Sequence, residues 1–355
     1  MNRLRSLTLF FLCSSLSFTH GADPAVETAL NNEPAMKPAY NDGYVRFYLD
    51  NDLFGGTDEN YTNGARLTWI SKSRELEDLP GLYRSLDWLL HQGDRRGGSP
   101  WLYNIGVSLT QLMFTPEDVF ATELIEDDRP YAGWLGLGFS LHAKTAKDLH
   151  SLELSLGVVG PSSLAENSQD SLHSLRDIEK SQGWDNQLEN ELTVNLHYRY
   201  TRQWFEFSAF GDRIELDGLY RVGFDLGNAW INANAATYIR AGWNLPTGFT
   251  DPTLSPTSYT QQMFMERRER LNPWSFFVTL GAEGRVVGRD IFLDGNTFED
   301  SPSIDKRNFV ADVTGAVTLR YDQFNVSYAH TYRTQEHAGQ DGGQFFGSLS
   351  IGFSF

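Results

Sequence analysis

Hydrophobic and polar residues alternate one by one along many short stretches of this chain. The first stretch, 44–49, sets two tyrosines and an arginine on one face and Val45, Phe47 and Leu49 on the other. A period of two indicates a β-strand whose two faces meet different surroundings. The pattern recurs to the end of the chain and predicts an all-β fold of about twelve strands: 44–49, 65–71, 102–113, 131–142, 150–158, 188–200, 204–210, 219–225, 274–287, 309–321, 324–332 and 345–355.

These strands are expected to cross a membrane. No apolar run of about 18 residues follows the N-terminal stretch, so no transmembrane helix is expected. Aromatic residues nevertheless make up 14% of the chain, and 32 residues are glycine. The last strand carries aromatic and aliphatic residues on one face and ends on Phe355, as outer-membrane barrels commonly do. We therefore expect a transmembrane antiparallel β-barrel rather than the alternative, a soluble sandwich.

The first 22 residues have the pattern of a secretory signal peptide, with Arg3 and Arg5 before an apolar run and small residues after it. We therefore expect one domain, the outer-membrane barrel of residues 23–355. Removal of the signal would take away Cys13, the only cysteine, which excludes a disulfide, a thiol nucleophile or a cysteine-bound metal. Losing Arg3 and Arg5 also moves the formal charge from −17 to −19. Such an acidic chain argues against nucleic acid as a partner and suits contact with divalent cations.

Strand parity assigns the connections to two sides of the membrane. A thirteenth alternating stretch, 235–243, is placed in a periplasmic connection, 229–273, because single-chain bacterial barrels have an even number of strands. Short helical segments are expected in two other connections, at 79–91 and within 162–187. With a periplasmic start, the loops expected on the outer side are 55–60, 114–130, 161–187, 211–218, 288–308 and 333–344.

The hairpin between the first two strands is rich in oxygen-bearing side chains: Asp50, Asn51, Asp52, Asp58, Glu59, Asn60 and Thr62. Hard oxygen ligands select Ca²⁺ or Mg²⁺, and the absence of EF-hand spacing means that such a site would draw on several loops. A solvated acidic hairpin is the alternative. The sequence has no Gly-x-Ser-x-Gly turn, no His-Glu-x-x-His and no phosphate-binding glycine loop before a helix.

His173 is the candidate general base, because histidine changes charge near neutral pH and this one lies in a polar loop. In a helix, Gln169 and His173 would share one face at a spacing of i and i+4. Glu179 follows in the same segment. The alternative is a histidine that is merely solvated.

Motifs over residues 44–200 resemble the lipid A 3′-O-deacylase family of outer-membrane enzymes. They occur in the family's order: Asn51-Asp52, Tyr61-Thr62-Asn63-Gly64, Asp128-Arg129, Gly157-Val158-Val159-Gly160-Pro161, Gln169 with His173 and Glu179, and Gln187 with Glu191. The C-terminal part matches only as barrel strands. One motif alone would be weak evidence for the family, but the set of motifs in this order is fairly specific to it.

The resemblance implies a twelve-stranded barrel and a calcium-dependent esterase that removes the 3′-linked acyl group of lipid A. His173 would activate water, while Asn51, Asp52, Thr62 and Gln169 would be further catalytic residues. Asp52 and Glu179 would bind Ca²⁺, which would polarise the ester carbonyl. The implied surroundings are the Gram-negative outer membrane, with lipopolysaccharide and other membrane lipids as partners and an active site at the outer leaflet. The lumen-facing ends of the first two strands are expected to form it. A monomer is the default expectation for a small barrel.

One departure from the family is that residues 114–130 contain no lysine, where the family has a functional one; Arg129 is the only basic residue there. Two alternatives stay open. A phospholipase A-like outer-membrane esterase would need a serine nucleophile beside a histidine, and no such pair is obvious in the sequence. A porin or a structural barrel would have no enzymatic activity.

Overall fold

The computed structural model describes residues 43–51, 60–90, 101–177, 179–209, 214–250, 263–266 and 273–355, without the side chains of residues 60–62, 88–89, 176, 263 and 265–266. Of the two units into which the chain divides, residues 1–37 lie outside this part and residues 38–355 contain the strands. The expected signal peptide and Asp52 lie outside the described residues, so those expectations stay predictions.

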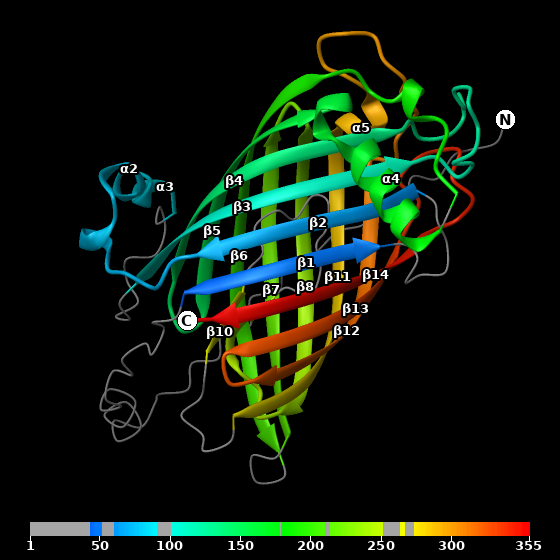
Figure 1. Cartoon of the computed structure of the whole chain (residues 1–355). Coiled ribbons are helices and arrows are strands. Elements are labelled where there is room, and N and C mark those ends of the chain that lie inside the picture. The colour runs from blue at the N-terminus through cyan, green and yellow to red at the C-terminus, as the bar shows by residue number, and fades with distance from the viewer. Residues whose placement is uncertain are drawn as a thin grey trace, which may run out of the picture. The chain divides into compact units, whose positions relative to one another are not determined.

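Twelve antiparallel strands close into a barrel, which confirms the expected fold (Figure 1). The barrel closes where β1 pairs with β14, and β9 and β10 form a separate two-stranded sheet. The barrel strands are β1 (Tyr44–Asn51), β2 (Asn60–Ile70), β3 (Leu102–Thr115), β4 (Ala132–Lys144), β5 (Asp148–Val159), β6 (Glu191–Ala209), β7 (Ile214–Gly227), β8 (Trp230–Trp243), β11 (Trp274–Asp290), β12 (Phe309–Tyr321), β13 (Phe324–Arg333) and β14 (Gln344–Ser354).

The expected strand count is correct, but two strand assignments are wrong. The stretches 188–200 and 204–210 belong to one long strand, β6, which continues through a register irregularity between Gln203 and Phe205. The stretch 235–243, assigned to a connection, is part of β8 and pairs with β7 and β11. Between these two stretches, where a turn was expected, polar residues continue the strand. The backbone N–H and C=O groups are hydrogen-bonded to the neighbouring strands there, and this pairing does not depend on the side chains.

Most of the expected outer loops meet at one end of the barrel, called the loop end below. It carries the connections 52–59, 116–131, 160–190, 228–229, 291–308 and 334–343. The expected outer loop 211–218 is wrong: the turn between β6 and β7 lies at the opposite end, and Ile214–Gly218 belongs to β7. Dividing β6 into two predicted strands had assigned the turn that follows it to the wrong side of the membrane.

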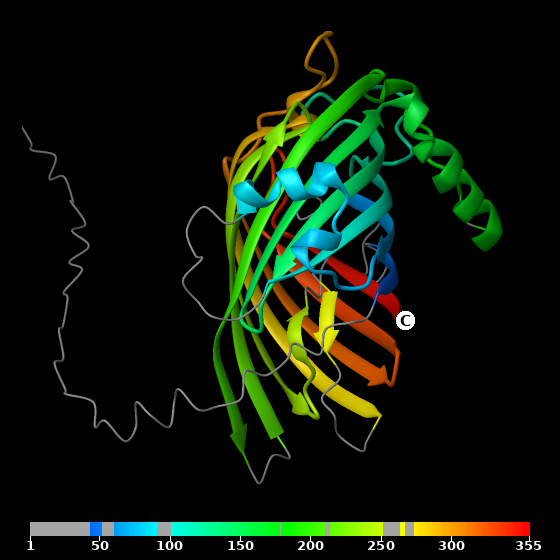
Figure 2. The same ribbon diagram turned by 90° about the vertical axis from the view of Figure 1, so that its left-hand side faces the viewer.

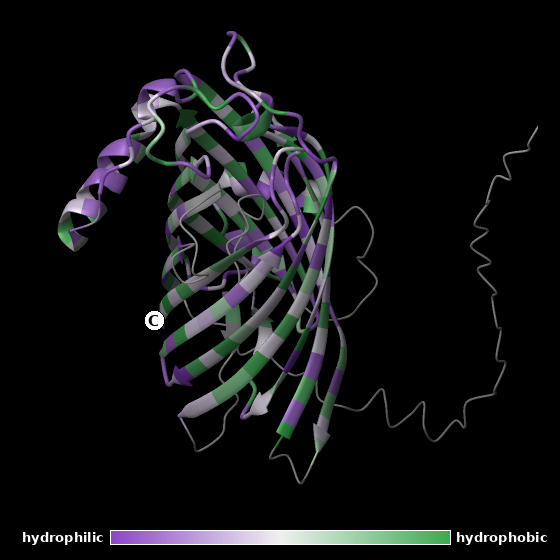
Figure 3. Cartoon of the chain, turned by 90° about the vertical axis from the view of Figure 1, so that its right-hand side faces the viewer, coloured by the Kyte–Doolittle hydropathy of each residue, from purple (hydrophilic) through white to green (hydrophobic). Residues whose placement is uncertain are grey.

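Hydrophobic and hydrophilic residues alternate along the strands, as the colour bands in Figure 3 show, and buried residues alternate with exposed ones in the same way. Large apolar residues such as Leu67, Phe139 and Ile239 point outward and are exposed. No helix in the described part of the chain has the length and apolar character to span a membrane.

The lumen is filled with paired charges. Arg66 and Glu153 lie 2.7 Å apart and are almost wholly buried, and Arg221 pairs with Glu283 in the same way. Arg285 pairs with Asp312 at 3.0 Å. Buried charges are tolerated when they are paired and hydrogen-bonded.

Both ends of the lumen are also closed by packed side chains. At the loop end, Phe292 of the short helix α5 (Ile291–Asp294) stacks on Phe114 at 4.3 Å and contacts Trp230 at 5.4 Å. At the opposite end, the hairpin of β9 (Thr247–Thr250) and β10 (Met263–Glu266) sits among lumen-facing residues. Its Phe264 lies 5.3 Å from the ring of His142. The described part of the barrel therefore does not favour an open porin.

The remaining helices lie in the connections. The expected helix at 79–91 consists of a 3₁₀ turn, η2 (Leu76–Asp78), and two short helices, α2 (Gly81–Ser85) and α3 (Asp87–Leu90). Leu79 and Leu90 pack there on Tyr103 and Leu141 of the barrel wall. The connection 160–190 contains η3 (Pro161–Ser163), α4 (Ala165–Arg176) and η4 (Trp184–Asn186), which confirms the expected helical content.

Candidate functional site

Helix α4 carries the two strongest candidate residues on its buried side. Ala165, Gln169 and His173 are buried, whereas Leu172 and Leu175 on the neighbouring flank are exposed. The spacing of i, i+4 and i+8 places the three buried residues on one face of a helix, as expected from the sequence. Figure 1 shows α4 in front of the loop ends of β2 and β3, and the perpendicular view in Figure 2 shows it outside the barrel wall.

Two glycines bring the start of α4 onto that wall. Gly133 faces outward on β4, where a Cβ atom would collide with Ser163 and Ala165. Gly160 has a φ of +94°, and a Cβ atom there would lie 2.6 Å from the carbonyl oxygen of Glu189. Glycine alone meets both demands, because it lacks a Cβ and tolerates positive φ. The Gly160-Pro161 motif therefore sets the turn from β5 into α4.

His173 is oriented by a main-chain carbonyl. Its Nδ1 lies 2.7 Å from the carbonyl oxygen of Glu179, which lies just beyond the end of α4. A carbonyl oxygen only accepts hydrogen bonds, so Nδ1 carries the proton in this contact. In the neutral ring, Nε2 then has the free lone pair that a general base needs. An ion pair of 2.6 Å between Lys180 and Asp170 also ties this segment to α4.

Gln169 is held by a residue that the sequence reasoning missed. The indole Nε1 of Trp184 donates to the Oε1 of Gln169 at 2.7 Å, and both side chains are buried. The Trp184 ring contacts the Tyr131 ring at a centroid distance of 4.9 Å. A tryptophan in an otherwise polar loop was the available signal, because a buried indole N–H usually requires an acceptor.

Asn51 lies on the outward face of the barrel rim. Strand pairing forms a row of outward positions, Asn51, Asn63, Met113 and Gly133, across β1 to β4. Met113 packs with Ala165 of α4, so this row leads from Asn51 to the helix. Asn51 therefore does not belong to the lumen-facing side of the strand end: Asp50, not Asn51, faces the filled lumen. One residue of register decides which face a strand residue occupies.

Thr62 occupies an irregular position in β2. Tyr61 pairs with Phe114 and Asn63 with Met113, which leaves Thr62 as an extra residue in the ladder between β2 and β3. A bulge of this kind often redirects a side chain near a functional site. The proposed role of Thr62 stays a prediction, as does that of Asp52, which lies outside the described residues.

The expected Ca²⁺ site stays a prediction, because Asp52 lies outside the described residues. No group of three or more histidine, cysteine, aspartate or glutamate side chains within the described part of the chain could hold a metal ion. Glu179 contributes its main-chain carbonyl to His173, and its side chain is exposed. Asp52 and Glu179 stay candidate ligands.

The family model described as "Outer membrane protein LpxR" matches residues 9–355. The chain belongs to the LpxR family of outer membrane proteins. The resemblance to lipid A deacylases noted in the sequence is thereby confirmed at the level of the family.

A solved structure supports the LpxR fold. "LpxR from Salmonella typhimurium" is 15% identical, with a TM-score of 0.69 over 88% of this chain and 100% of that chain. The β domain of the Bordetella autotransporter BrkA is 10% identical over 89% of this chain and 99% of its own, with a TM-score of only 0.40. No curated protein matches the sequence.

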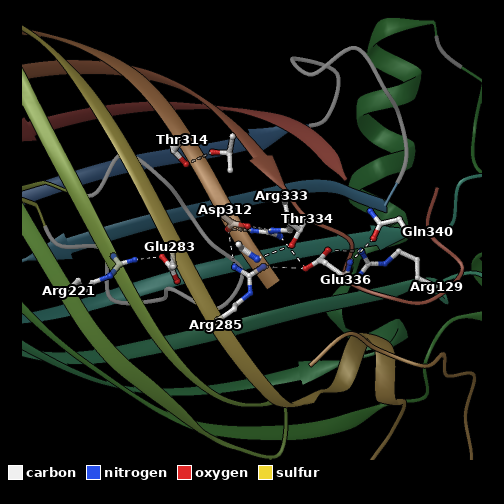
Figure 4. Close-up of polar contacts among 12 residues, drawn as sticks. Arg129, Arg221, Glu283, Arg285, Asp312, Thr314, Arg333, Thr334, Glu336 and Gln340 are labelled. Atoms are coloured by element: carbon white, nitrogen blue, oxygen red, sulfur yellow. Dashed lines mark hydrogen bonds and ion pairs between the residues drawn. The ribbon is translucent and has the colours of Figure 1, made fainter. Parts of the chain in front are cut away.

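Two further LpxR motifs anchor loops in this structure. Arg129, beside Asp128, is buried and lies 3.5 Å from Glu336 in a network that joins three loop-end segments (Figure 4). Glu191 accepts a hydrogen bond of 2.6 Å from the backbone N–H of Thr297. Arg129, the only basic residue of 114–130, is thus engaged in this buried network.

A serine–histidine–aspartate relay is present in the lumen of this LpxR-family barrel. The Oγ of Ser155 lies 2.9 Å from Nε2 of His197, whose Nδ1 lies 2.7 Å from Asp225. These distances resemble those of a catalytic triad. All three residues are buried, however, and Arg199 also pairs with Asp225 at 2.9 Å. A lipid ester outside the barrel cannot reach Ser155, so this relay does not favour the phospholipase A-like alternative.

Proposed function

We propose that this protein is a lipid A 3′-O-deacylase, an esterase that hydrolyses the 3′-linked acyl group of lipid A in the outer leaflet of the Gram-negative outer membrane. The observation that carries the proposal is the orientation of His173 by the carbonyl of Glu179 on a helix outside the barrel wall. Membership of the LpxR family agrees with this assignment.

The reaction needs a base, and His173 meets the requirement. Its Nε2 takes a proton from water, while its Nδ1–H stays on the carbonyl of Glu179. The water oxygen attacks the acyl carbon, and the tetrahedral intermediate collapses with cleavage of the bond to the sugar oxygen. The proton on His173 passes to that oxygen, so the products are a free hydroxyl and a fatty acid. No covalent enzyme intermediate is required.

The developing oxyanion needs hydrogen-bond donors. Gln169 lies one helical turn before His173, and its buried Nε2 has no partner within the described part of the chain. With its Oε1 already engaged by Trp184, this amide nitrogen is available to the oxyanion. A donor of this kind contributes about 10²- to 10³-fold to the rate. The amide of Asn51, on the outward rim, is the second proposed donor.

A lipid substrate also needs an apolar surface beside the polar site. Leu172 and Leu175 are exposed on the flank of α4, at 44% and 83%. On the wall below Gly133, outward-facing Leu137 is exposed as well. Acyl chains can therefore lie against both surfaces while the ester reaches His173. The enzyme is proposed to act as a monomer, with outer-membrane lipids around the barrel and the loop end toward the outer leaflet.

Mass spectrometry of lipid A from cells that make the wild type, His173→Gln or His150→Gln tests the proposal. His150 is the matched control because it lies near the start of β5, at the opposite end of the barrel, and contacts Tyr198. Wild type and His150→Gln are expected to release one 3′-linked acyl mass, and His173→Gln is not. Unchanged lipid A with correctly folded wild type in the outer membrane would refute the deacylase assignment.

A further inference from the structure

Trp184 is a buried aromatic residue that contacts the candidate site through a single polar atom. It is 3% exposed, and its indole N–H donates to the Oε1 of Gln169. An indole nitrogen donates and never accepts. The contact therefore determines which end of the Gln169 amide faces Trp184, and the NH₂ group must point away from it.

The ring of Trp184 packs on the loop before β4, in a buried cluster that also includes Ala165 of α4. Its ring packs against Tyr131, whose hydroxyl donates to the carbonyl of Val119 at 2.8 Å. The carbonyl of Trp184 accepts a bond of 3.0 Å from the side chain of Gln187. The backbone N–H of Gln182 donates to the same Val119 carbonyl at 2.9 Å. Trp184 thus links the loop before β4 to the amide of Gln169.

The amide nitrogen of Gln169 lowers the stability of the folded protein as long as it has no acceptor. The Nε2 of Gln169 is buried and has no hydrogen-bond partner among the described residues. A buried donor left unpaired is unfavourable, and such donors are found where a ligand or substrate supplies the acceptor. A rotation of the amide by 180° would instead present Oε1 to the substrate, where two oxygen atoms would repel each other.

We propose that Trp184 is a positioning residue for deacylation, which keeps the NH₂ group of Gln169 directed at the ester oxyanion. This inference rests on the proposed function of the same site. Trp184 itself does not touch the substrate. Its N–H excludes the amide orientation that would place Oε1 of Gln169 against the oxyanion. Its contacts with Tyr131 and Gln169 also connect the loop before β4 to α4.

The test measures kcat and KM for lipid A hydrolysis by purified full-length Trp184→Phe, which keeps an aromatic ring against Tyr131 and removes the N–H together with part of the indole ring. We expect kcat to fall about tenfold with little change in KM, as the loss of one buried hydrogen bond implies. Trp204→Phe is the matched control, because Trp204 is exposed on the outside of β6 and is expected to keep full activity.

A double-mutant comparison separates positioning from a general structural role. If Trp184 acts through Gln169, Trp184→Phe has no further effect on kcat in a Gln169→Ala background. Equal losses in both backgrounds, or full activity of Trp184→Phe, would overturn the positioning role while the deacylase function stands.

A measurement independent of activity tests the hydrogen bond itself. The indole N–H resonance of Trp184, assigned by its absence in Trp184→Phe, should shift and exchange faster with solvent in Gln169→Ala. An unchanged resonance would overturn the inference whatever the activity. A folded wild type that leaves lipid A intact but retains this bond would overturn the proposed function, and with it the positioning role.

Discussion

The Nη1 atom of Arg129 lies 3.5 Å from the Oε2 atom of Glu336, and this contact joins the loop before β4 to the loop before β14 (Figure 4). Glu336 also pairs with Arg285 and Arg333. Burial alone would raise the pKa of Glu336, but the guanidinium groups of Arg333, Arg129 and Arg285 outweigh it and hold the pKa below its usual value. One carboxylate thus holds together three cations at the loop end.

Glu336→Gln should therefore destabilise the protein strongly. Removing one member of a buried charge network leaves its partners uncompensated and costs about 3–5 kcal/mol. The measurement is the free energy of unfolding in detergent or lipid. Lys180→Gln is the control, because its pair with Asp170 is largely exposed and should be worth less than about 1 kcal/mol. A smaller effect for Glu336→Gln than for Lys180→Gln would contradict the anchoring role.

His337 should make stability dependent on pH. Burial, followed by the nearby Arg129 guanidinium, lowers its pKa to about 4 in the folded protein. The unfolded chain binds this proton near pH 6.5, so the unfolded state holds more protons between these values. Stability is therefore greatest above pH 6.5 and falls as the pH drops toward 4. Unfolding temperatures from pH 4 to 8 should decline less steeply at the acid end in His337→Gln. Parallel curves for the two proteins would count against this account.

Glu179→Gln should distinguish the two roles assigned to this residue. The main-chain carbonyl that orients His173 is retained in the variant, whereas the carboxylate expected from the family resemblance to bind Ca²⁺ is lost. We expect kcat at saturating Ca²⁺ to stay within about twofold, and the Ca²⁺ concentration needed for half activity to rise about tenfold. The measurement is lipid A hydrolysis titrated with Ca²⁺ after chelation. An unaltered Ca²⁺ requirement would remove Glu179 from the ligand set.

Ser155→Ala should leave lipid A hydrolysis unchanged. Ser155, His197 and Asp225 form a relay in the filled lumen, where no lipid ester has access. Activity of Ser155→Ala should stay within about twofold of wild type, while His173→Gln loses at least about a hundredfold. A loss in Ser155→Ala comparable to that in His173→Gln would revive the serine-esterase alternative.

Strand patterning predicted the barrel well but not every strand. The count of twelve was correct because two errors cancelled: β6 was divided, and β8 was assigned to a connection. Alternation shows that a segment is a strand, whereas the place where one strand ends depends on its partners. The pairing of β8 with both β7 and β11 could be seen only after the barrel had closed.

The sequence by itself determined the β-barrel class, the helical face shared by Gln169 and His173, and membership of a family through ordered motifs. These features depend on residues close together in the chain, where periodicity and spacing are sufficient. The tertiary structure decided that Asn51 faces outward, that Trp184 orients Gln169, and that Arg129 is buried against Glu336. Such contacts join distant segments, and their existence depends on strand register, where a shift of one residue reverses every face.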